Sequence, residues 1–96
     1  MPANTPSLAV LTARSQKALG EFLEIELDLA ATFLQTAAIE AGSDPEHCNH
    51  AVDKARIALE AVRHFRKRIE DQAKHDKIRG RADELETALD AFRKSH

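Results

Sequence analysis

The sequence predicts an all-α protein, folded as an elongated, antiparallel three-helix bundle. Residues that favour helices, mainly Ala, Leu, Glu, Arg and Lys, dominate the composition, while there are four Phe and no Trp or Tyr. Apolar residues recur three and four positions apart. The segment 42–45 supplies a stop and a start between two such patterns. The expected helices span residues 7–41, 44–70 and 75–94. A flexible tail, 1–6, precedes a single domain, 7–96.

The boundary between the first two helices is the clearest turn signal in the chain. Gly42 stands where a helix commonly ends, and Pro45 is tolerated in a first helical turn. Ser43, followed three residues later by Glu46, matches a capping box at the start of the second helix. Because the connection is short, the two helices should lie antiparallel.

A change of apolar phase predicts a third helix. The core positions of the second helix reach Ile69, and the same phase would continue to Asp76, which is polar. A new apolar set begins at Ile78, offset by two residues, which is more than helix drift can absorb. We therefore expect a break around 70–75. A continuous helix over 44–94, exchanged between two chains, remains an alternative, since no proline interrupts this segment.

The first helix carries more apolar surface than one neighbour can cover. One stripe comprises Leu11, Ala18, Phe22, Ile25, Leu29 and Phe33, and a second comprises Leu19, Leu23, Leu27, Ala30, Leu34, Ala37 and Ala41. Together they span roughly 200°, whereas packing on one helix needs about 100°. We expect the surplus to bind another chain and so complete a four- or six-helix assembly. The candidate interface residues are Leu19, Leu23, Leu27 and Leu34.

Glu26 is the residue that breaks this apolar sector. In an antiparallel hairpin it would lie level with Leu59, with Arg56 and Arg63 one turn away on either side. An unpaired buried carboxylate is costly, so we expect an ion pair between Glu26 and Arg56 or Arg63 that fixes the helix register. Two alternatives remain open: a carboxylate lining a ligand or metal cavity, or one at the edge of a dimer interface.

The segment DPEHCNH, residues 44–50, concentrates groups that can bind metals. His47 and His50 are three residues apart on one helix surface, but Cys48 lies on the core stripe and points elsewhere. Zinc needs about four ligands, and the sequence has no second cysteine. We therefore predict a capped helix start with a buried thiol, and no metal or other cofactor. A ligand- or metal-binding regulator using His47 and His50 is the alternative.

Charge is segregated along the chain, although the net charge is only −2. Residues 1–53 carry two basic and eight acidic side chains, while residues 54–81 carry ten basic and four acidic ones. Clustered Lys and Arg over 63–81 would suit a nucleic-acid-associated protein. We favour a structural role for these cations, because they should lie beside the acidic first helix and suit a helix C-terminus.

Several function classes lack support in the sequence. It contains no phosphate-binding loop, HExxH, CxxC or nucleophile elbow, so we do not expect an enzyme. No apolar run approaches the roughly 18 residues of a membrane span, and the N-terminus lacks the pattern of a secretory signal. With one cysteine and no possible internal disulfide, the chain fits the cytoplasm.

Two segments of the helical hairpin carry a family resemblance. ELDLAATFLQTA (26–37) and NHAVDKARIALEAVRHF (49–65) resemble a group of small, uncharacterised bacterial helical proteins, and more loosely the hairpins of tetratricopeptide or MIT-type domains. The resemblance implies a helical interaction module and assigns no functional residues. We therefore expect a protein that acts by protein–protein contact or self-association through its first helix, with a homo-oligomer or another helical protein as partner.

Overall fold

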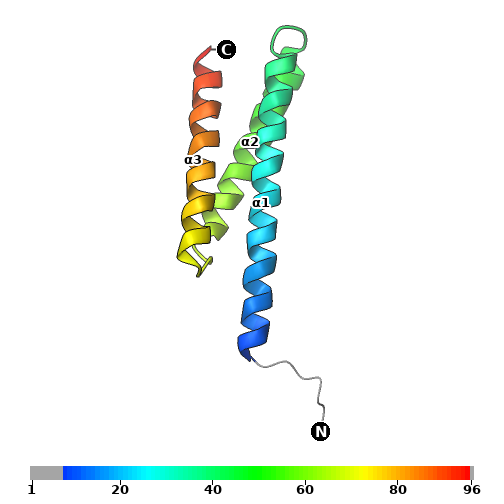
Figure 1. The fold of residues 1–96 in the computed structure, drawn as a ribbon. Helices are drawn as coiled ribbons and strands as arrows, with labels where there is room; N and C mark the ends of the chain where they lie inside the picture. The colour runs from blue at the N-terminus through cyan, green and yellow to red at the C-terminus, as the bar shows by residue number, and fades with distance from the viewer. Residues whose placement is uncertain (1–7, 96) are drawn as a thin grey trace.

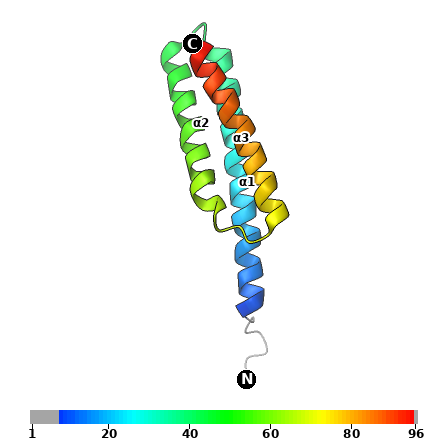
Figure 2. The same ribbon diagram turned by 90° about the vertical axis from the view of Figure 1, so that its left-hand side faces the viewer.

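The computed structural model consists of three α-helices joined by short turns. They are α1 (Leu8–Glu40), α2 (Pro45–Arg66) and α3 (Gln72–Ser95). The structure describes the backbone of residues 8–95 and the side chains of residues 14–95, so the expected tail, 1–6, lies outside the described part. α2 runs back along α1, and α3 packs beside both (Figures 1 and 2). The predicted all-α, antiparallel three-helix bundle is confirmed.

The bundle is elongated because its helices differ in length. Its extents are 64 × 24 × 15 Å, and its radius of gyration is 17.3 Å, against about 13 Å for a compact domain of this size. The 33 residues of α1 span about 50 Å, whereas the 22 residues of α2 span about 33 Å. The N-terminal turns of α1 therefore extend past the α2–α3 turn (Figure 1). None of the three helices has an apolar stretch long enough to cross a membrane.

One core runs between the three helices. Its largest fully buried side chains are Leu23, Leu27, Val62 and Ile78. Much of the remaining core is alanine, at positions 30, 37, 51, 55, 58 and 82. Because alanine occupies little space, the helix backbones can approach one another closely along most of the bundle. Burial is densest in α2, which contributes seven buried residues, against three from α3.

The first turn is capped by a different residue from the one predicted. Asp44, not Ser43, is the N-cap of α2, and its Oδ1 accepts a hydrogen bond from the backbone N–H of His47 at 3.1 Å. Ser43 instead donates to Oε2 of Glu40 at 3.4 Å, so the predicted capping box is wrong. Pro45 lies in the first turn of α2 as expected.

The second break occurs earlier than predicted. α2 ends at Arg66, and the chain turns before α3 begins, so residues 44–94 do not form a continuous helix. Asp71 starts α3, because its Oδ1 accepts from the backbone N–H of Lys74 at 2.9 Å. Ile69 lies in the turn but is only 6% exposed. Ile69 is in phase with the apolar residues of α2 and is buried like them, although the helix has already ended. Apolar periodicity therefore predicted an end for α2 that is several residues too late.

Gln16 attaches α1 to this second turn. Its Nε2 donates to the carbonyl oxygen of Arg68 at 2.8 Å, and its Oε1 accepts from the backbone N–H of Glu70 at 2.9 Å. One turn further along α1, the side chain of Lys74 lies over Gly20, where an added Cβ would be 3.2 Å from Lys74 Cδ. These contacts hold the start of α3 against α1.

Candidate interaction surface

The four leucines predicted to form an interface belong to the internal core. Leu23 and Leu27 have no exposed surface, and Leu19 and Leu34 are partly buried against the same core. The assignment of this stripe to another chain is therefore wrong. The physical reason is that α2 and α3 together cover this part of the wide apolar sector of α1.

A different apolar stripe of α1 remains exposed. The side chains of Phe22, Ile25 and Leu29 are 40%, 57% and 41% exposed, and Ile57 on α2 is 57% exposed. Phe22 packs edge-on against Phe65 of α2, with ring centroids 5.9 Å apart. We call the surface formed by Phe22, Ile25, Leu29 and Ile57 the outer face.

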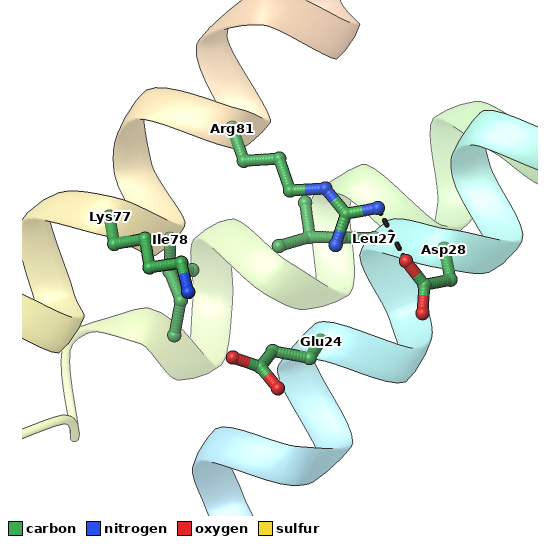
Figure 3. A pocket seen from close by; sticks show the side chains of 6 residues that line it. All are labelled: Glu24, Leu27, Asp28, Lys77, Ile78 and Arg81. Carbon is green, nitrogen blue, oxygen red and sulfur yellow. Dashed lines mark hydrogen bonds and ion pairs between the residues drawn. The ribbon is translucent and has the colours of Figure 1, made fainter.

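The outer face lies on the side of the α1–α2 hairpin away from α3. α1 meets α3 through Glu24, Leu27 and Asp28, which share a hollow with α3 side chains (Figure 3). At about 100° per residue, Leu29 points roughly 160° away from Leu27. Ile25 follows the same stripe as Leu29, four residues apart. The exposed apolar residues therefore lie on a different side of α1 from its contact with α3.

Cationic and aromatic groups accompany the α2 side of this surface. Lys54 Nζ lies over the ring of Phe33, 5.6 Å from the ring centroid. The Arg68 guanidinium lies over the ring of Phe65, 5.3 Å from that ring's centroid. Phe33, Lys54 and His50 also line a shallow groove of about 130 Å³ between α1 and α2. The surface beside the outer face is thus partly aromatic and positively charged.

The predicted ion pair of Glu26 is not formed, because both arginines have other partners. Arg56 Nη1 bonds to Oε1 of Glu60 at 2.8 Å. Arg63 Nη2 bonds to Oδ1 of Asp83 at 3.1 Å and also to Glu86. Arg56 and Arg63 line a hollow with residues of α3, so they lie on the α3 side of α2. Arg63 therefore links α2 to α3 and not α2 to α1.

Glu26 itself is partly buried on the α2 side of α1. Its position lies four residues after Phe22 and seven before Phe33, both of which contact α2. Phe22 and Leu29, four residues before Glu26 and three after it, lie beside it on the helix surface, so Glu26 stands at the edge of the outer face.

The structure brings His47 together with two carboxylates and not with His50. The ligand atoms of Glu40, Asp44 and His47 lie within 4.8 Å of one another. Ligands bonded to one zinc ion at about 2.0–2.1 Å would be closer together, roughly 3.3 Å apart. Asp44 already caps α2, and Cys48 is buried away from this group. Capping and the turn account for the cluster without a metal.

The hollow between α1 and α3 is lined by charges of both signs. Its volume is about 250 Å³, and Glu24 and Asp28 face Lys77 and Arg81 across it (Figure 3). Arg81 forms an ion pair with Asp28. Because the charges are balanced and partly paired within the chain, this hollow strengthens the α1–α3 contact and shows no preference for a charged ligand.

Internal pairing also reduces the charge available at the basic end, residues 63–81. Arg63 and Arg81 bond to acids on other helices, and Arg79 Nη2 lies 3.8 Å from Oδ1 of Asp76. For these three of the eight Lys and Arg side chains in 63–81, the contacts agree with the predicted structural role, and Arg81 is the one that pairs with the acidic first helix.

Comparison with known protein families, curated proteins and solved structures finds no match to this chain. The sequence contained part of the signal for the outer face, since Phe22, Ile25 and Leu29 belong to one of the two predicted stripes of α1, whereas Ile57 belongs to neither. What periodicity could not decide was which stripe the other helices would cover.

Proposed function

We propose that this chain is a helical interaction module that acts by protein–protein contact through its outer face. The observation that carries the proposal is the grouping of Phe22, Ile25, Leu29 and Ile57, each 40–57% exposed, on one side of the hairpin. A contiguous apolar patch on a small protein marks an interaction site more often than scattered exposed residues do. A helix of the partner laid along the α1–α2 hairpin would cover it.

The other conspicuous groups support this proposal by having structural roles. Asp44 accounts for the cluster near His47, and three of the eight Lys and Arg side chains of the basic end form ion pairs within the described part of the chain. We accordingly propose neither an enzymatic activity nor a cofactor, and give less weight to metal binding at 44–50 and to nucleic-acid binding at 63–81. A cytoplasmic location is part of the proposal and rests on the lone cysteine, Cys48.

Photo-crosslinking in cells tests the proposal directly. A photoreactive phenylalanine analogue replaces Ile25 on the outer face and, as the matched control, Glu84, an exposed residue of α3. We expect a discrete covalent adduct from position 25 and none from position 84. The adduct's mass identifies its partner as another protein or a second copy. Equal labelling from both positions, or no protein adduct from position 25, would overturn the proposal.

A further inference from the structure

Two cross-helix contacts establish which residues of α1 and α2 lie level on the outer side of the hairpin. Phe22 packs against Phe65, and Lys54 lies over Phe33. In both pairs the residue numbers add to 87, so antiparallel residues whose numbers add to about 87 share a height. Ile57 is then level with Ala30, about one residue from Leu29. The exposed apolar residues of the two helices therefore form one continuous patch.

The two helices that form this patch carry opposite charge. In α1 the segment 18–40 contains no Lys or Arg and has five acidic residues. In α2 and the following turn, the segment 54–68 has six Lys or Arg and one acid, Glu60. On the outer side, Glu21 and Glu26 accompany the apolar stripe of α1, while Lys54 and Arg68 lie over aromatic rings on the α2 side.

We propose that the occupant of the outer face is a second copy of this chain, with α1 of each copy lying along α2 of the other. This inference rests on the proposed function and names its partner. A twofold axis parallel to the helices produces the arrangement and preserves the heights of all residues. Leu29 of one copy then meets Ile57 of the other, and Glu21 comes between His64 and Arg68.

Charge selects this arrangement over the other symmetric one. A twofold axis perpendicular to the helices would place α1 on α1, and the segment 18–40 has no basic residue to offset the acids of its twin. Like charges brought together across an interface oppose association. Pairing α1 with α2 instead brings Glu21 and Glu26 of each copy to the side of α2 that carries Lys54 and Arg68.

The size of the hairpin suits a stable dimer. The 22 residues of α2 give a contact length of about 33 Å, and two adjacent helices are about 20 Å wide. The footprint is therefore about 660 Å² per copy, or roughly 1,300 Å² in total, within the range of specific interfaces, about 1,200–2,000 Å². Two hairpins joined in this way form a four-helix core, with α3 of each copy outside it.

Sedimentation equilibrium of the full chain over a wide concentration range tests the inference. We expect a species of twice the chain mass of 10.6 kDa. Leu29→Asp should abolish it, whereas Ala38→Asp should not, because Ala38 is also exposed on α1 but points about 180° away from Leu29. Circular dichroism and thermal melting of each variant establish that it is folded.

Charge reversal tests the orientation. Glu21→Arg and Arg68→Glu should each raise the dimer dissociation constant about tenfold, since each acts at two symmetric positions. The double variant Glu21→Arg/Arg68→Glu should recover most of the affinity. Its failure to recover would overturn the pairing of α1 with α2.

The outcomes separate this inference from the proposed function. A wild-type chain that stays monomeric at the highest soluble concentration, or a dimer that survives Leu29→Asp, would overturn the second-copy inference. If position 25 still crosslinks to another protein in cells, the proposed function stands with a different partner. If neither an adduct nor a dimer forms, both are refuted.

Discussion

The two hydrogen bonds of Gln16 predict that this side chain stabilises the α2–α3 turn. In Gln16→Ala, the carbonyl of Arg68 and the N–H of Glu70 both lose their partner. Each net hydrogen bond contributes about 0.5–1.5 kcal/mol, and the lower half of this range applies because both contacts are exposed. Alanine also favours a helix slightly more than glutamine does. We expect a net loss of about 1 kcal/mol and a fall in Tm of roughly 4–8 °C.

Urea denaturation and native-state hydrogen exchange measure this effect. The amide of Glu70 should exchange faster in Gln16→Ala, because it no longer has an acceptor. Gln35→Ala is the matched control, since Gln35 is an exposed residue of the same helix for which the described contacts include no hydrogen bond. If the two variants lose the same stability, or if the Glu70 amide keeps its protection in Gln16→Ala, the assigned role of Gln16 is refuted.

Three further substitutions test the packing and the helix ends. Gly80→Ala should stabilise the fold by about 0.5–1 kcal/mol in urea denaturation, because its Cβ would meet no atom within 4 Å inside α3; a loss would contradict this. Leu27→Ala should cost about 2–5 kcal/mol and Leu29→Ala less than about 1, measured at concentrations that keep the chain monomeric; similar costs would refute the assignment of core and outer face. Asp44→Ala should cost about 1 kcal/mol by thermal melting, while Asp44→Asn retains most of the stability because it can still cap; equal losses would show that the cap is not the cause.

Helix number, order and direction could be predicted from the sequence because they depend on local signals. Apolar spacing identified three helices, and the Gly42–Pro45 segment gave the first turn to within one or two residues. The second turn was placed too late because Ile69 is buried without being helical. Apolar periodicity indicates which residues are buried, but it does not show whether a buried residue is helical, and Ile69 is buried after α2 has ended. The better signal was Asp71, a good N-cap residue in front of α3.

The contacts between side chains could not be predicted as well. The wide apolar sector of α1 was recognised, but the direction from which α3 would approach decides which stripe is covered, and no single-helix pattern contains that information. The same gap explains the misassigned partners of Arg56 and Arg63. Height along the hairpin was estimated correctly to within a turn, yet these arginines lie on the side of α2 that faces α3.

The distribution of contacts gives the three helices different strengths of attachment. α3 buries only Ile78, Ala82 and Leu89, and several of its links to the other helices are ion pairs. Salt screens such pairs, while it leaves the alanine-rich contact between α1 and α2 largely unaffected. Rising ionic strength should therefore loosen α3 ahead of the rest, so that the hairpin alone forms the last cooperative unit to open.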